Sequence, residues 1–198
     1  MKYKFLETIK ILDGRIYHLP YHQLRVDNVF RAYKRDNTQQ LKELLENVPS
    51  QGLFRCRVVY DVDGDFQYEY IPYKKRLINR LKIVYNNDLV YDKKYNDRKE
   101  IEDLLKQKGE CDDILIVQNG LCTDTSIANV AFYDGKRWLT PKKPLLEGTT
   151  RARLLQEGFL HEADIELSSV KSFQKMALMN AMIDFDIIAQ DNLEDIMC

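Results

Sequence analysis

Four Asn-Gly or Asp-Gly dipeptides, each placed between apolar runs, constrain the fold of this 198-residue chain more than any other feature. Asparagine, aspartate and glycine tolerate the positive φ angles that two-residue hairpin turns require. Asp13-Gly14 and Asp63-Gly64 predict hairpins in the first third of the chain, and Asn119-Gly120 and Asp134-Gly135 predict a meander later on. The chain is therefore expected to be rich in antiparallel sheet.

Residues 1 to 76 read as a small α+β domain in the order hairpin, two helices, hairpin. Apolar residues at helical spacing predict the helices, and β-branched and aromatic residues predict the strands. The expected strands are Phe5 to Leu12, Arg15 to Leu19, Leu53 to Val62 and Phe66 to Ile71, and the expected helices are Tyr21 to Lys34 and Thr38 to Val48. The basic, weakly patterned run after Pro72 marks the domain boundary.

Residues 77 to 198 are expected to form a second domain that mixes strands and helices. The expected strands are Leu81 to Tyr85, Ile114 to Val117, Val130 to Tyr133, a short strand ending at Leu139, another within Ala163 to Val170, and a last one at Phe185 to Ile188. Helices are expected at Arg98 to Lys108 and from Thr149 to about Glu157, with a helix or turn at Ser172 to Ala181.

The composition excludes several classes of function. Lysine and arginine number 30 against 31 acidic residues, so no global basic field favours nucleic acid or an anionic membrane. No apolar run approaches the roughly 18 residues that cross a bilayer. The cysteines, Cys56, Cys111, Cys122 and Cys198, lack metal-ligand spacing. Reduced thiols, a cytoplasmic location and no metal site are the expectations.

Lys94 is the first residue that could carry chemistry. Neighbouring positive charge and partial desolvation lower the pKa of a lysine, and Lys93 and Arg98 are such neighbours. A lowered pKa leaves more of the amine unprotonated at neutral pH, the form that acts as nucleophile and general base. The alternative is one more solvated lysine among 30 basic residues.

Two further features lie in the second domain. Asp124 follows a predicted strand and stands among hydroxyl residues, and the N–H groups of Gly148, Thr149 and Thr150 open a helix, which is typical of an anion site. The alternatives are an Asx-turn or capping role for Asp124 and an ordinary N-cap for Thr149. For Arg25, on a helix of the first domain, the alternative to a binding role is a surface salt bridge.

Taken together and in this order, these residues resemble the motifs of the class IV aminotransferase family. Lys94-Tyr95-Asn96-Asp97-Arg98 is similar to the K-x-x-N-R or K-Y-x-D-R motif of that family. In the family, this lysine forms a Schiff base with pyridoxal 5'-phosphate (PLP). Asp124 to Asn129 resembles E-x-x-x-x-N, whose acid pairs with the ring nitrogen of PLP, although here aspartate replaces glutamate.

The remaining motifs of the family concern the phosphate of PLP. Gly148-Thr149-Thr150-Arg151 resembles G-I-T-R, and His22-Gln23-Leu24-Arg25 resembles H-L-E-R, so the resemblance assigns Arg25, Thr149 and Thr150 to the phosphate. Asn180-Ala181 is similar to an N-A segment near the phosphate and the ring face, or is simply a turn before the last strand.

The resemblance implies a fold type IV PLP enzyme of mixed α+β class, with a small α+β domain (1–76) and a PLP-binding pseudo-barrel domain (77–198). PLP would lie between the domains, Lys94 would be catalytic, and the protein would be a homodimer. The implied reaction is amino-group transfer from an amino acid. Two alternatives stay open: a 4-amino-4-deoxychorismate lyase that releases pyruvate and 4-aminobenzoate, and a non-catalytic binding protein with the same fold.

Overall fold

The computed structural model describes residues 3–190, 193 and 196, which fold into two units. Unit 1 comprises Met1–Lys75 and Lys93–Asp97, and unit 2 comprises Arg76–Asp92 and Arg98–Cys198. The chain passes from unit 1 to unit 2 after Lys75. The short return of the chain into unit 1 at Lys93–Asp97 has no counterpart in the expected division into 1–76 and 77–198.

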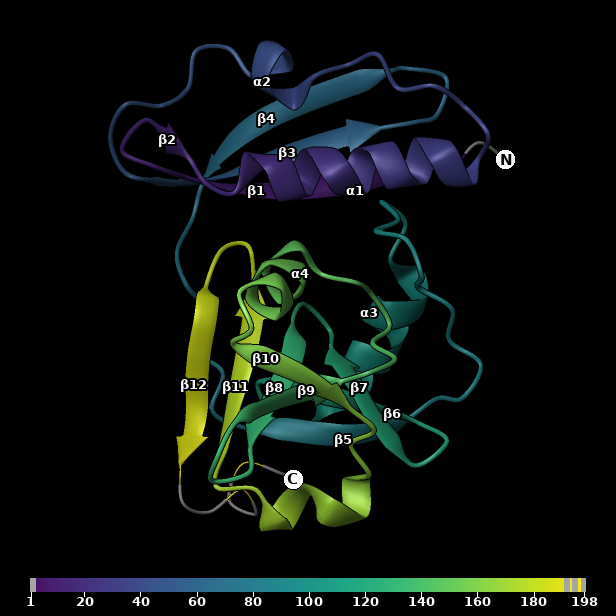
Figure 1. The fold of residues 1–198 in the computed structure, drawn as a ribbon, viewed down its shortest axis with the longest axis vertical. Helices are drawn as coiled ribbons and strands as arrows, with labels where there is room; N and C mark the ends of the chain where they lie inside the picture. The colour runs from purple at the N-terminus through teal and green to yellow at the C-terminus, as the bar shows by residue number, and fades with distance from the viewer. Residues whose placement is uncertain (1–2, 191–192, 194–195, 197–198) are drawn as a thin grey trace. The chain divides into compact units, whose positions relative to one another are not determined.

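Unit 1 is a four-stranded antiparallel sheet in the order β2-β1-β3-β4, with α1 along one face (Figure 1). Its elements are β1 (Phe5–Leu12), β2 (Arg15–Ile16), α1 (Leu19–Ala32), α2 (Leu41–Leu44), β3 (Leu53–Tyr60) and β4 (Phe66–Pro72). The core lies between the sheet and the helices and includes Phe5, Ile9, Val26 and Phe30. Asp13 and Gly14 take φ angles of 48° and 80°, which confirms the predicted turn between β1 and β2.

Two elements of unit 1 are shorter than the sequence predicts. The helix expected at Thr38 to Val48 is a single turn, Leu41–Leu44. The Gln23 side chain receives the Leu41 N–H at 2.8 Å and donates to the Gln39 carbonyl at 3.1 Å, so an amide side chain occupies backbone groups that a longer helix would use. β2 ends at Ile16 because α1 already starts at Leu19, after His18 in a left-handed conformation.

Residues 93–97 pair with the start of β1. The Leu6 N–H donates to the Lys94 carbonyl and the Asn96 N–H to the Lys4 carbonyl, both at 2.8 Å. An antiparallel bridge joins Phe5 to Tyr95, whose rings lie 5.5 Å apart. β3 pairs along one edge of β1, and β2 pairs only with Ile11 and Leu12 on the other edge. Residues 93–97 therefore pair with the start of β1 on the edge that it shares with β2. Backbone hydrogen bonds therefore fix the position of Lys94 within unit 1.

Unit 2 is built on a strand path β10-β9-β8-β7-β6-β5, to which β11 adds through β8 and β12 through β11 (Figure 1). The first half contains β5 (Leu81–Tyr85), α3 (Lys99–Leu105), the 3-10 helix η1 (Lys106–Lys108), β6 (Asp113–Gln118), β7 (Leu121–Thr125) and β8 (Asn129–Tyr133). The second half contains β9 (Trp138–Pro141), α4 (Thr149–Gln156), β10 (Leu160–Ala163), the 3-10 helix η2 (Leu167–Ser172), β11 (Lys175–Asn180) and β12 (Asp184–Gln190). Because β8 pairs with β7, β9 and β11, the sheet branches there.

The helix or turn predicted at Ser172 to Ala181 is wrong, because most of this segment is strand β11. β11 lies between β8 and β12, and its central residues Met176, Ala177, Leu178 and Met179 are at most 1% exposed. A strand that is buried on both faces loses the alternation of apolar and polar residues, so its sequence cannot be told from a buried helical turn.

The cysteines depart in part from the expectation of reduced thiols. Cys111 is disulfide-bonded, whereas Cys56 and Cys122 are free and buried. Burial raises the pKa of both free thiols to about 12, so neither is a reactive thiolate at neutral pH. Across the part of the chain that the structure describes, no group of metal-ligating side chains and no helix long and apolar enough to span a membrane is found.

Candidate functional site

In unit 1 the candidate residue Arg25 binds Glu7, a residue that the motifs do not single out. Helix α1 presents His22 and Arg25 on one face, one turn apart, toward Glu7 on β1. Arg25 Nε donates to Glu7 Oε1 at 2.7 Å, and Arg25 Nη2 donates to Oε2 at 2.6 Å. His22 Nδ1 lies 2.6 Å from the same Oε2. The arginine is thus held in a forked pair with a carboxylate that is fully buried.

The charges of this cluster favour an ionised Glu7. Burial alone would raise the pKa of Glu7, but the Arg25 charge and the hydrogen bonds from His22 and Arg25 outweigh it and lower the pKa to about 2. Burial also lowers the pKa of His22, against the raising effect of Glu7. A neutral His22 beside an ionised Glu7 must carry its proton on Nδ1, so the ring donates to the carboxylate.

The sequence contains a signal for Glu7 that motif matching misses. Phe5, Glu7, Ile9 and Ile11 alternate along β1, and all four side chains are 0% exposed. A carboxylate on the core-facing side of a strand needs a partner, since an unpaired buried charge is very costly. The basic residues of the following helix are the natural candidates for that partner.

In unit 2, Asp124 lies at the centre of a buried polar network. The Asn129 Nδ2 group donates to Asp124 Oδ1 at 2.7 Å, and the Leu146 N–H donates to Oδ2 at 2.9 Å. Asp124 and Asn129 face each other at the junction of β7 and β8. Burial raises the pKa of the Asp124 carboxyl to about 7, although these hydrogen bonds and the charge of Arg151 act in the opposite direction. A carboxyl near its pKa at neutral pH changes charge readily when a cationic group approaches it.

The two threonines stand at the start of helix α4, as the sequence predicts. Thr149 and Thr150 are 7% and 4% exposed, and Gly148 precedes the helix in an extended conformation. Among the described residues, Gly148 at the N-cap offers no side-chain cap, and no acidic residue lies in the first turn of the helix. The partial positive charge of the helix start therefore meets no carboxylate within its own first turn, a condition that favours an anion.

Arg151, the last residue of the Gly148 to Arg151 motif, supports the helix. Its guanidinium donates to the Pro141 carbonyl at 2.9 Å and pairs with Glu162 at 2.6 Å, and the residue is 4% exposed. These contacts fix the start of α4 against β9 and β10.

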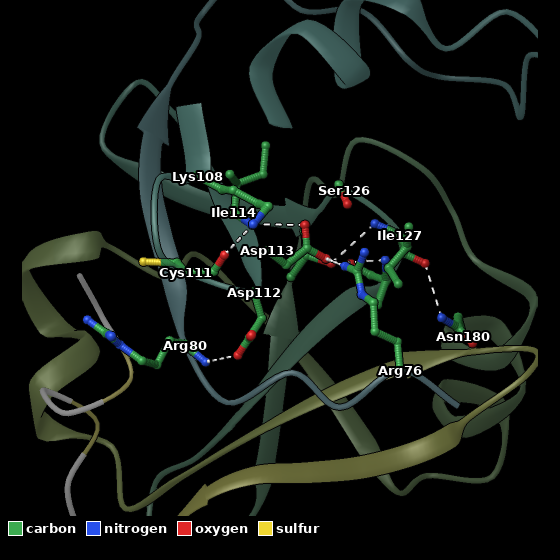
Figure 2. A network of polar contacts seen from close by, with 12 residues as sticks. Arg76, Arg80, Lys108, Cys111, Asp112, Asp113, Ile114, Ser126, Ile127 and Asn180 are labelled. Carbon is green, nitrogen blue, oxygen red and sulfur yellow. Dashed lines mark hydrogen bonds and ion pairs between the residues drawn. The ribbon is translucent and has the colours of Figure 1, made fainter. Parts of the chain in front are cut away.

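Asn180 ends β11, and Ala181 follows it in the turn before β12. Asn180 Oδ1 receives the N–H groups of Met182 and Ile183. Its Nδ2 group donates to the Ile127 carbonyl at 3.2 Å (Figure 2). Asn180 thus caps its own turn and joins it to the loop that follows Asp124.

That loop also contains a buried hydroxyl that the motifs do not assign. Ser126 is 4% exposed, and within the described part of the chain its Oγ atom has no hydrogen-bond partner. Its carbonyl receives a hydrogen bond from Arg98, which holds the loop in place. A buried hydroxyl without a partner is costly, so the loop is built with a donor available for a ligand.

Comparison with known proteins gives the family. The amino-transferase class IV family matches residues 4–189. A Haemophilus influenzae protein without an assigned function is 36% identical over 91% of this chain and 98% of its own length. A crystal structure from Haemophilus somnus, named a putative 4-amino-4-deoxychorismate lyase, is 34% identical, covers 92% of this chain and 97% of its own, and superposes with a TM-score of 0.83.

A more distant structure shares the fold. The PLP-bound form of a hypothetical aminotransferase from Mycobacterium tuberculosis is 16% identical, covers 96% of this chain and 82% of its own, and has a TM-score of 0.78. The chain belongs to the class IV aminotransferase family, and it is an enzyme of the aminotransferase or lyase type with a mixed α+β, type IV fold. The predictions of family, fold class and enzyme type are confirmed, and the non-catalytic alternative is set aside.

Proposed function

We propose that this enzyme uses PLP to remove the α-proton of an amino substrate, with amino-group transfer to a keto acid as the overall reaction. The observation that carries the proposal is the buried Asp124 carboxyl, which lies in a network of amide donors beside the first turn of α4. The orphaned Ser126 hydroxyl and the uncapped start of α4 also fit a cofactor that has an aromatic ring and a phosphate.

The proposed roles follow the family motifs residue by residue. Lys94 would hold PLP through its amine, Asp124 would hold the ring nitrogen, and Arg25, Thr149 and Thr150 would hold the phosphate. Asn180 and Ala181 would border the phosphate and the ring face. Bound PLP supplies an electron sink for the electron pair that remains on the α-carbon when its proton leaves.

Two residues control the protonation states in this scheme, Lys94 by proton transfer and Asp124 by keeping a proton on the ring nitrogen. Lys94 Nζ would take the proton from the substrate α-carbon and return it as general acid. Asp124, as the carboxylate, would keep the ring nitrogen protonated, because a cation beside a buried acid favours the ionised acid. Arg25 would add positive charge for the phosphate while Glu7 holds its orientation.

A second candidate reaction, elimination of pyruvate from 4-amino-4-deoxychorismate, is favoured by one observation. The relative of known structure that is 34% identical over 92% of this chain carries the name of that lyase. The same general base, ring acid and phosphate site serve both reactions, because both begin with loss of the α-proton.

PLP titration of the purified protein tests the shared part of the proposal. We expect a PLP-dependent absorbance band, and borohydride treatment should fix the cofactor covalently on Lys94, as read by peptide mass spectrometry. Lys93→Ala is the matched control and should keep the label, whereas Lys94→Ala should lose it. A label that persists in Lys94→Ala, or a wild-type protein that takes up no PLP, would overturn the assignment.

The two reactions differ in their need for a second substrate. A panel of amino acids, each offered with a keto acid acceptor, should yield the corresponding keto acid if the enzyme is an aminotransferase. Incubation with 4-amino-4-deoxychorismate alone should release pyruvate if it is the lyase. Pyruvate release without turnover of any amino donor would replace the first reaction with the second.

A homodimer and a cytoplasmic location remain proposals. Large apolar side chains of unit 2 lie exposed, with Leu77 at 70%, Tyr85 at 68% and Val90 at 71%, and they support association with a second copy. Light scattering coupled to gel filtration should give twice the monomer mass of 23.4 kDa. Cell fractionation should place the protein with cytoplasmic markers.

A further inference from the structure

Asn129 has no role in the proposed function, yet its side chain contacts Asp124, Leu146 and Gly148 of the proposed cofactor site. It is 6% exposed and opens strand β8. Its Nδ2 group donates to Asp124 Oδ1 at 2.7 Å and to the Leu146 carbonyl at 2.8 Å, while the Leu146 N–H returns to Asp124 Oδ2 at 2.9 Å. The three residues thus close a ring of hydrogen bonds in which both hydrogens of one amide group are used.

The oxygen of the same side chain lies against Gly148. A Cβ atom built on Gly148 would stand 2.0 Å from Asn129 Oδ1, far inside any real contact distance. Gly148 has a φ angle of −68°, which every residue adopts, so the requirement for glycine here comes from the close approach of Asn129 and not from backbone strain. Gly148 directly precedes Thr149, the first residue of α4.

We propose that Asn129 is a positioning residue that sets Asp124 and the start of α4 in one register, so that the ring acid and the phosphate donors act on one ligand. The inference rests on the proposed function for the identity of that ligand. The amide nitrogen fixes the carboxylate and the loop at Leu146, and the amide oxygen fixes how closely Gly148 can approach. A shift of about 1 Å between such groups is enough to cost a large factor in binding or rate.

Two independent substitutions should disturb the same arrangement. Asn129→Leu keeps a similar side-chain volume but removes both donors. Gly148→Ala keeps Asn129 and displaces its side chain by steric contact. Thr140→Val is the matched control. The Thr140 side chain is fully buried, and its hydroxyl donates to the Val130 carbonyl at 2.8 Å. The substitution therefore removes one buried hydrogen bond from the same sheet and none of those made by Asp124.

The first measurement uses the protein without PLP. The carboxyl carbon of Asp124 is followed by NMR against pH in protein labelled at aspartate, with Asp124→Asn to assign the signal. Wild type and Thr140→Val should titrate near the pKa of about 7, and Asn129→Leu should titrate higher, because a hydrogen bond to the ionised form is lost. Gly148→Ala should move in the same direction.

The second measurement is PLP affinity. Asn129→Leu and Gly148→Ala should each weaken PLP binding on the order of tenfold, because each displaces the amide that fixes Asp124 and the start of α4. If Asn129→Leu does not fold, Asn129→Ser replaces it, since serine keeps a hydroxyl at that position and removes less hydrogen-bonding capacity.

The outcomes separate this inference from the proposed function. Unchanged Asp124 titration in both Asn129→Leu and Gly148→Ala, or PLP affinity equal to that of wild type in both, would overturn the positioning role. A change of the same size in Thr140→Val would reduce the effect to general loss of packing and would also overturn it. If wild type binds no PLP, the proposed function fails, while the titration without PLP still decides the role of Asn129.

Discussion

Glu7 in unit 1 and Asp124 in unit 2 are two buried carboxyl groups whose pKa values are shifted in opposite directions. Glu7 is 0% exposed and Asp124 is 5% exposed, so loss of hydration raises the pKa of each. The final pKa values nevertheless lie on either side of the ordinary range, at about 2 for Glu7 and about 7 for Asp124.

The difference lies in the charge of the donors. Glu7 meets a guanidinium in a forked pair as well as an imidazole, whereas the hydrogen bonds of Asp124 come from amide N–H groups. The positive charge of Arg25 at hydrogen-bond distance, together with the hydrogen bonds from Arg25 and His22, outweighs the desolvation of Glu7, and the neutral donors of Asp124 do not outweigh its desolvation. Glu7 is therefore ionised at every physiological pH, while Asp124 stays responsive to a cation that binds beside it.

Removing the charge of Glu7 should cause the largest loss of stability among the substitutions considered for the two carboxylates. Glu7→Gln removes the buried charge that Arg25 and His22 bind, and because the Arg25 side chain is only 15% exposed, we expect a loss of about 3–5 kcal/mol in the free energy of unfolding. Urea unfolding followed by circular dichroism measures it. A loss below about 1 kcal/mol would mean that Arg25 finds another partner and that the cluster contributes little.

The pH dependence of stability should separate the two carboxylates. The pKa of Glu7 is lowered on folding, so its contribution is present above pH 4.5 and is lost as the pH falls toward 2. The pKa of Asp124 is raised, so the folded protein binds the extra proton between pH 3.8 and about 7, and stability falls as the pH rises through that window.

Unfolding free energies measured from pH 4.5 to 7 therefore exclude the titration of Glu7, while His22, whose pKa is lowered on folding, adds a slope of the opposite sign. The slope from Asp124 should reach at most about 1.4 kcal/mol per pH unit, which sums to no more than about 4 kcal/mol. Asp124→Asn should remove this slope, whereas Glu7→Gln should leave it in place. An equal slope in wild type and Asp124→Asn would show that Asp124 is ionised throughout, like Glu7.

If Asp124 holds the ring nitrogen of PLP, as proposed, Asp124→Asn should change the chemistry without releasing PLP. An amide cannot keep the ring nitrogen protonated, so we expect PLP to remain bound while exchange of the substrate α-proton with D2O slows by about 10²-fold, or about 2.7 kcal/mol. Proton NMR of the amino acid follows the exchange. Asp124→Glu, which restores the acid of the family motif, is the control that should keep most of the rate. Normal exchange in Asp124→Asn would reduce Asp124 to a structural residue.

The sequence predicted the features that depend on neighbouring residues in the chain, namely the turns and the start of helix α4. The turns at Asp13-Gly14 and Asn119-Gly120 have positive φ at both residues, as the dipeptides require, and strands form on either side of each. The start of α4 at Thr149 was also predicted, because its motif is short and continuous in sequence, and the role of Asp124 stays a prediction.

Long-range contacts account for what the sequence did not predict. The hydrogen bond from Leu6 to Lys94, which brings the candidate lysine into unit 1, joins segments far apart in the chain and leaves no local pattern. The pairing of Glu7 with Arg25 across β1 and α1 is of the same kind, although a glutamate on the apolar face of a strand signals a buried partner. β11 escaped prediction because burial on both faces removes its alternation.

The smallest effect is expected at an ion pair of unit 1 that is exposed to solvent, in contrast to the buried pair of Glu7 and Arg25. Arg57 and Glu69 form a pair on neighbouring strands of the same sheet as Glu7, at 3.3 Å, but their side chains are 33% and 55% exposed. Glu69→Gln should therefore change the free energy of unfolding by no more than about 0.2–1 kcal/mol, because water already screens the charges. Urea unfolding beside Glu7→Gln gives the ratio directly. If the two substitutions cost the same, the number of charges would govern stability in unit 1; a several-fold larger cost for Glu7→Gln means that burial of the carboxylate does.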